Sequence, residues 1–255
     1  MASPALRRLI ADNAVLWAGE AEVIRTYWDS PVRTRETDRT WIFHQAYKEF
    51  WDGFAPAART LAEGWEQVDE GWPRAEALGA AAVARDELAH YAAFADLYEW
   101  VRDPEGPPLS PTALRERGNW PENKALGRLR AAHCEAWGPL WARAQQLTEG
   151  GYVVLYREGS ALVERGGLDG AIAAACRVVY EDEIDHMISG LAGIEEAGLS
   201  EADWDCLAEL TTAQCRQRIR MRDAQFGHPV APARLQALLE GAVEPQAFDW
   251  KRAGL

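Results

Sequence analysis

The sequence holds little that would direct the chain to a membrane, to nucleic acid or into a β-sheet. No stretch approaches 18 consecutive apolar residues, so we expect no membrane span. Acidic residues outnumber basic ones, and the net charge of −13 argues against a surface that binds nucleic-acid phosphates. Period-two alternation is short wherever it occurs and β-branched residues are sparse, which argues against a chain built from strands.

Several sequence signals of other protein classes are also missing. The N-terminal segment has charges through its middle and lacks the apolar core of a secretory signal, so we expect a cytoplasmic protein. The four cysteines form no Cys-x-x-Cys pair, and each falls on a predicted helix, so we interpret all four as reduced core residues. We find no phosphate-binding loop, dinucleotide fingerprint or nucleophile motif.

What the sequence does contain is helical periodicity along most of its length. We predict that Pro56 bends the second helix and that a short helix follows the HPVAP segment near the C-terminus. Another helix should end near Trp137, before a break at Gly138-Pro139. The long predicted helices cover about residues 4–28, 37–66, 73–100, 140–165, 170–197 and 200–226.

The connection over residues 103–122 is rich in proline and lies between two predicted helical hairpins. Short loops make the helices of each hairpin antiparallel, and the long connection can return along the length of the bundle. We therefore predict an all-α fold in which residues 38–197 form a four-helix bundle with one long crossover. Residues 1–30 and 200–255 would add flanking helices to the same domain, which spans residues 1–255.

Two of the predicted helices carry Asp-Glu-x-x-His, in RDELAHY at 85–91 and EDEIDHM at 181–187. Glu87 and His90, like Glu183 and His186, stand three residues apart on otherwise apolar helix faces. Burying such groups without partners would be costly, and divalent metal ions would offset the cost by taking them as ligands. The repeated motif therefore predicts a metal centre inside the bundle.

Each hairpin should add one glutamate from its first helix at the height of the motif on its second helix. In the first hairpin we prefer Glu49, with Asp52 as the alternative. In the second we prefer Glu149, because Glu158 would lie more than two turns away along the helix axis. The predicted metal ligands are Glu49, Glu87, His90, Glu149, Glu183 and His186.

This pattern, one Glu from each of two helices and Glu-x-x-His from each of two more, resembles the ferritin-like di-iron carboxylate superfamily over about residues 38–197. That superfamily includes the ribonucleotide reductase radical subunit, bacterial multicomponent monooxygenases, rubrerythrins and arylamine N-oxygenases. The resemblance implies that Asp86 accepts a hydrogen bond from His186 and that Asp182 accepts one from His90, which would fix both imidazole rings. It also implies two iron ions, or manganese and iron, with O₂ as co-substrate.

The resemblance implies a non-haem di-iron oxygenase or oxidase that acts on a small organic molecule. An external electron donor would be a further partner, and the chain would form a homodimer. We expect neither nucleic acid nor a membrane as a partner. Two other classes stay open: a ferroxidase or peroxide-scavenging protein of the ferritin or rubrerythrin type, and a helical interaction protein with a vestigial site. His44 lies within about a turn of Glu49 and is either a polar packing residue, an extra ligand or a proton relay. Tyr91, Tyr152, Tyr156 and Tyr180 are core residues, or one of them is a redox group that the sequence does not single out.

Overall fold

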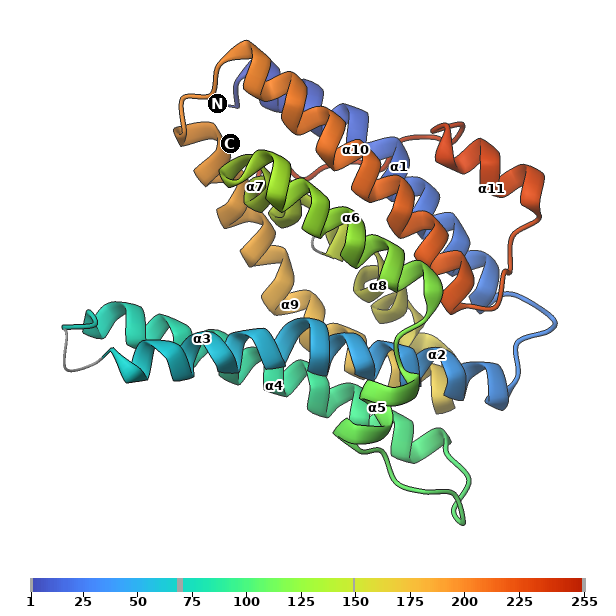
Figure 1. Cartoon of the computed structure of the whole chain (residues 1–255). Coiled ribbons are helices and arrows are strands. Elements are labelled where there is room, and N and C mark those ends of the chain that lie inside the picture. The colour runs from blue at the N-terminus through green and yellow to red at the C-terminus, as the bar shows by residue number, and fades with distance from the viewer. Residues whose placement is uncertain (1, 68–70, 149, 254–255) are drawn as a thin grey trace. The chain divides into compact units, whose positions relative to one another are not determined.

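The computed structural model describes residues 2–67, 71–148 and 150–253, and these residues form helices joined by turns and loops (Figure 1). No strand occurs in these three ranges. The all-α class predicted from the sequence is therefore confirmed. None of the helices in the described ranges has the length and the apolar character needed to cross a bilayer.

The order of the elements along the chain agrees with the prediction, but the helices predicted over about 37–66 and 140–165 are each divided into shorter elements. The elements are α1 (Pro4–Trp28), α2 (Arg35–Tyr47), the π-helix η1 (Lys48–Phe54), α3 (Ala55–Glu66), α4 (Arg74–Val101), α5 (Pro111–Arg117), α6 (Pro121–Trp137), α7 (Pro139–Thr148), α8 (Gly150–Ser160), the 3₁₀-helix η3 (Ala161–Arg165), α9 (Gly167–Glu196), α10 (Glu201–Gln225) and α11 (Pro232–Leu239).

Local side-chain chemistry explains where several helices begin and end. Ser200 caps α10 by accepting a hydrogen bond from the backbone N–H of Asp203, whose carboxylate accepts one from Ser200 N in return. Gly198, just before this cap, has a φ of +61°, a left-handed conformation that glycine adopts without strain. The predicted start of this helix is confirmed.

One expectation about the chain needs correction. The cysteines are not all core residues: Cys176 and Cys215 are buried, but Cys134 is exposed and Cys206 is half-buried. Cys134 lies on α6, whose sequence pattern leaves this position outside the buried stripe. The proline-rich connection contains the short helix α5, which Ser110 caps and Pro111 opens.

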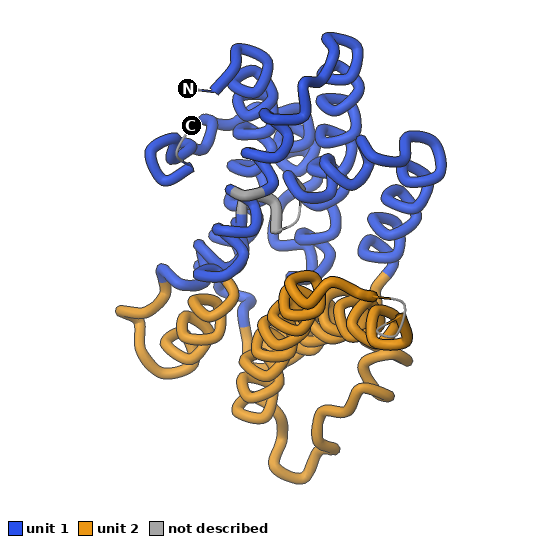
Figure 2. Tube along the Cα trace, turned by 90° about the vertical axis from the view of Figure 1, so that its left-hand side faces the viewer, with its two compact units in different colours: residues 1–33, 121–161, 180–255 blue, residues 34–120, 162–179 orange. Residues whose placement is uncertain are grey.

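The chain divides into two compact units (Figure 2). Unit 1 comprises residues 1–33, 121–161 and 180–255, and unit 2 comprises residues 34–120 and 162–179. The single domain with a core at 38–197 stays a prediction, as does the four-helix arrangement of that core.

Unit 1 is organised around the two helices that the sequence suggested were flanking additions. α1 packs along α10, and α10 also contacts α6 and α7. Their seam buries an ion-pair cluster in which Arg218 and Arg222 both donate to the Glu20 carboxylate, at 3.0 and 3.1 Å. Two arginines around one glutamate lower the pKa of Glu20, although burial alone would raise it.

Unit 2 contains the predicted first hairpin. α2, η1 and α3 follow one another along α4, and each of the three contacts it (Figure 1). Trp41 and Phe94 meet edge-to-face across the hairpin, with ring centroids 6.3 Å apart, and both side chains are fully buried. This packing holds the two helices at a fixed register and so decides which polar residues face each other further along.

Candidate metal centre

The first hairpin contains a π-helix where the sequence predicted a bend. Pro56 has no N–H to offer to the carbonyl four residues earlier, and its ring would clash with that carbonyl in a regular α-helix. The chain responds with the wider turn of η1, in which Ala55 N–H donates to Phe50 O, five residues back. The wider turn covers Lys48–Phe54 and therefore includes Glu49.

Glu49 is the buried acid of this segment. Only 5% of its surface is exposed, and the fully buried Gln45 donates a 2.7 Å hydrogen bond from Nε2 to Glu49 Oε1. The bond orients the carboxylate from one turn earlier on the same helix. The alternative ligand, Asp52, has a side chain 41% exposed and pairs with Lys48 at 3.8 Å. Burial therefore favours Glu49 over Asp52 as the residue that could face a metal ion.

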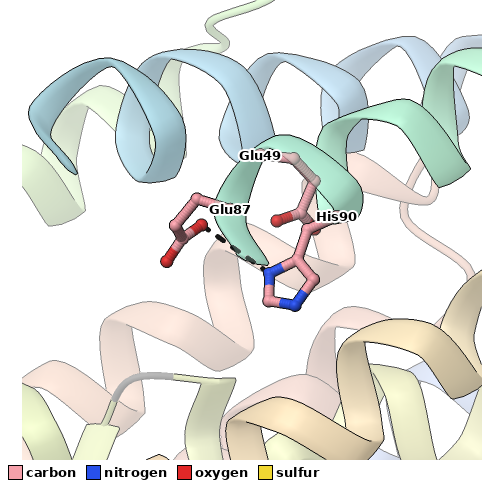
Figure 3. Close-up of side chains that lie close together, drawn as sticks. All are labelled: Glu49, Glu87 and His90. Carbon is pink, nitrogen blue, oxygen red and sulfur yellow. Dashed lines mark ion pairs between the residues drawn. The ribbon is translucent and has the colours of Figure 1, made fainter. Parts of the chain in front are cut away.

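Glu87 and His90 stand on α4 and face the π-helix (Figure 3). His90 is fully buried, and its Nδ1 lies 3.7 Å from Glu87 Oε2. That separation is too long for a strong hydrogen bond but suits two donor atoms that share a cation. The i, i+3 spacing of the motif thus translates into converging side chains.

Gly53 makes room for Glu87. A Cβ at this position would clash with Glu87 Oε2 and lie 3.2 Å from its Cδ. Since Gly53 follows Glu49 by four residues within the π-helix, the same segment that carries one carboxylate receives the other. η1 therefore contributes to the site in two ways. Glu49 supplies a carboxylate, and Gly53, which has no side chain, leaves the space that Glu87 occupies.

Glu49, Glu87 and His90 form a set of possible metal ligands. One ligand atom from each lies within 4.8 Å of the other two. Two donors bonded to opposite sides of one ion at about 2.1 Å lie about 4 Å apart, so small side-chain shifts suffice to bind a metal ion. Two carboxylates and one imidazole also match the preferences of iron and manganese.

Glu183 and His186, on α9, repeat the local geometry of the first motif. His186 Nδ1 lies 3.8 Å from Glu183 Oε1, compared with 3.7 Å in the Glu87–His90 pair. The two residues belong to unit 1, whereas the cluster described above belongs to unit 2. The set of six ligands stays a prediction.

The remaining predicted residues have the following places. Glu149 lies outside the described residues. Its alternative, Glu158, pairs with Arg25 at 3.2 Å and with Arg157 at 2.6 Å, so its carboxylate is already engaged by two cations. Asp86 accepts hydrogen bonds from the guanidinium of its neighbour Arg85. The hydrogen bonds of Asp86 and Asp182 to the motif histidines stay predictions.

His44 and Tyr91 lie in unit 2 with the cluster. His44 Nδ1 is 2.8 Å from Gly118 O, and since a carbonyl only accepts, Nδ1 carries the proton. Burial lowers the pKa of His44, which this hydrogen bond offsets in part. Tyr91 packs edge-to-face on Phe50 of the π-helix, and burial raises the pKa of its phenol. Both side chains are thus neutral at pH 7.

Sequence reasoning missed the role of Gln45 and the π-helix itself. The signal for Gln45 was its position four residues before Glu49, where the two side chains meet on a helix face. The signal for the π-helix was Pro56 inside an otherwise continuous helical pattern.

In comparisons with known proteins, no family model matches this chain, and no curated protein and no solved structure matches it either.

Proposed function

We propose that this chain is an O₂-activating non-haem dimetal oxygenase or oxidase that acts on a small organic molecule. The observation that carries the proposal is the convergence of Glu49, Glu87 and His90 on one point in a helical hairpin. Burial of the Glu49 carboxylate and the His90 imidazole beside a second, half-buried carboxylate is costly unless a cation is present, so the arrangement favours a metal centre over a structural role.

The donor set favours iron, or manganese with iron, over softer metals, because no thiolate takes part. When bound, such a metal pair supplies the one-electron and O₂ chemistry that side chains alone lack. Glu49, Glu87 and His90 would hold one part of it. We propose Glu183, His186 and Glu149 for the remainder, because the second motif repeats the spacing of the first, and its Glu–His separation of 3.8 Å is close to the 3.7 Å of the first. This completes the ferritin-like bundle proposed for residues 38–197.

The chain's own side chains would prepare the site before any reaction. Gln45 holds Glu49 by a hydrogen bond, and Gly53 leaves the space into which Glu87 turns. Full burial of His90 keeps water from its ring and strengthens its interaction with a cation. A reaction of this kind also needs an external electron donor, which we include in the proposal together with a cytoplasmic location.

Metal analysis tests the proposal most directly. The full-length chain, purified from cells supplied with iron and manganese, should contain about two metal ions per chain. His90→Ala and Glu183→Ala should both lose metal, whereas Asp52→Asn, which changes a partly exposed acid of the same π-helix, should keep it. Glu149→Gln and Glu158→Gln decide between the two candidate ligands of the second hairpin.

The outcomes are distinct. A metal-free wild type that folds normally and is indifferent to all of these substitutions would overturn the proposal. Loss of metal in His90→Ala but not in Glu183→Ala would reduce it to a site within unit 2. Oxygen uptake by the Fe(II)-loaded protein then separates the classes, because a ferroxidase oxidises iron added in excess and an oxygenase stops once its bound metal is oxidised.

A further inference from the structure

Unit 2 contains a pocket of about 420 Å³ that the metal centre does not use. It opens between α2, the C-terminal end of α4, the loop that follows and α5. Its volume lies within the range of small-molecule sites, about 300–1,000 Å³. The side chains that carry the argument are Arg39, Phe43, His44, Tyr98, Arg102 and Arg117.

The pocket offers ring surfaces to a planar ligand. Phe43 and Tyr98 stand side by side with centroids 5.7 Å apart and planes inclined by 50°. His44, which is adjacent to Phe43 in the chain, is supported from behind by Trp120 at a centroid distance of 4.7 Å. Apolar and aromatic walls with a few placed polar groups are typical of small-molecule sites.

Two of the three arginines that line the pocket are bound by acidic side chains or backbone carbonyls around it. Arg39 donates to Glu36 at 2.7 Å and to Asp103 at 2.9 Å. Arg102 pairs with Glu99, and its Nη1 donates to the backbone carbonyls of Asp103, Pro104 and Gly106. The acids that line or support the pocket are therefore each paired with an arginine.

Arg117 differs from both. Among the described residues no carboxylate lies within ion-pair distance of its guanidinium, which instead sits 5.7 Å from the centre of the Phe43 ring. The planar fork of arginine is suited to bind a carboxylate through two parallel hydrogen bonds.

His44 supplies a second polar function. Because Nδ1–H donates to Gly118 O and burial lowers the pKa of the imidazole, the ring is neutral and its Nε2 is a hydrogen-bond acceptor.

A phosphate dianion would meet only one uncommitted guanidinium here and would be repelled by Glu36 and Asp103. A singly charged carboxylate avoids most of that repulsion.

We infer that this pocket is a binding site for a small aromatic carboxylate, whose carboxylate pairs with Arg117 and whose ring lies against Phe43 and Tyr98. The site does not depend on the proposed metal centre. Its ligand would bind about 7–8 Å along the helix from Glu49, because His44 precedes Glu49 by five residues at 1.5 Å per residue.

Calorimetric titration of the full chain with 2-naphthoate tests the site, with 2-naphthamide as the uncharged ligand of the same shape. We expect 2-naphthoate to bind with a Kd below about 1 mM, and Arg117→Ala to weaken that binding by about tenfold or more. Arg117→Lys, which keeps the charge but loses the fork, should fall between the two. Arg115→Ala is the matched control, since Arg115 lies on the same short helix but over the ring of Trp51, outside the pocket.

Equal affinity for the acid and the amide, equal binding by Arg117→Ala and wild type, or no binding of 2-naphthoate at millimolar concentration would each overturn the inference. Circular dichroism verifies that the exposed Arg117 substitutions leave the helices intact. The titration is repeated on His90→Ala protein, where unchanged binding is expected. The experiment can therefore distinguish a failure of the metal proposal from a failure of the proposed binding pocket.

Discussion

Glu87 Oε2 occupies the space that a side chain on Gly53 would need. The contact joins α4 to the π-helix at the level of the candidate metal centre. The Glu87 carboxylate can take its position only because Gly53 carries no methyl group. The relationship gives the first of four predictions.

Gly53→Ala should displace the Glu87 carboxylate and weaken iron binding by roughly tenfold, as expected for a misplaced ligand or its support. The free energy of unfolding should change little, because alanine favours a helix by about 1 kcal/mol over glycine and offsets the local crowding. Gly79→Ala on α4 is the control, since nothing lies within 4 Å of its added methyl group. Unaltered iron affinity in Gly53→Ala, measured by competition with a chelator, would contradict the proposed placement of Glu87.

Gln45→Leu should lower iron affinity by about threefold to tenfold, because Glu49 loses the hydrogen bond that orients its carboxylate. The chain contains a matched pair on its surface, where Gln236 donates to Glu240 with the same i, i+4 spacing. Gln236→Leu should leave iron affinity unchanged. If both substitutions have the same effect, the Gln45–Glu49 bond has no role in the site.

His44 should make the protein less stable at acidic pH. Its pKa is lowered by burial, so the unfolded chain binds a proton more readily than the folded one. The free energy of unfolding therefore falls as the pH drops below the unfolded value of about 6.5, until the folded pKa is reached, by at most about 1.4 kcal/mol per pH unit. His44→Gln should flatten this dependence in urea unfolding between pH 7.5 and pH 5. A slope identical to wild type would show that His44 is solvated.

Glu20→Gln should destabilise the protein by about 3–5 kcal/mol, because Arg218 and Arg222 would keep two charges in the core with no anion between them. Glu22→Gln is the control on the same helix. Glu22 pairs with Arg234 at the partly exposed edge of α1, where an ion pair contributes about 1 kcal/mol or less. If chemical denaturation shows that the two variants lose similar amounts of unfolding free energy, the buried cluster contributes no more to stability than the exposed ion pair.

The sequence predicted the helices well because their signals are local. Ser200 and Gly198 mark the ends of α10 and α9 by chemistry that acts within four residues. The bend near Pro56 was also local, but its form was not, since a missing N–H can produce a kink, a break or a π-helix. The packing of η1 against α4 decides among these.

The candidate site was predictable in part for the same reason. The Glu-x-x-His spacing on α4 places Glu87 and His90 on one face whatever surrounds them. The choice of Glu49 over Asp52 rested on hairpin arithmetic, which has an error of about one turn, and burial separates the two residues more sharply. Gln45 and Gly53 could not be assigned roles until the carboxylates they serve were placed in space.

The sequence by itself determined the helical class, most helix ends, and a pair of carboxylate–histidine motifs on apolar faces, because periodicity and capping act between residues a few positions apart. Only the tertiary structure decided that α1 joins α10 around a buried ion pair, and that a π-helix carries Glu49 to Glu87 and His90. It also decided that the Arg117 guanidinium lies over the Phe43 ring, with no carboxylate of the described residues within ion-pair distance. Each of these depends on contacts between residues distant in the chain, and the packing of whole helices sets such contacts.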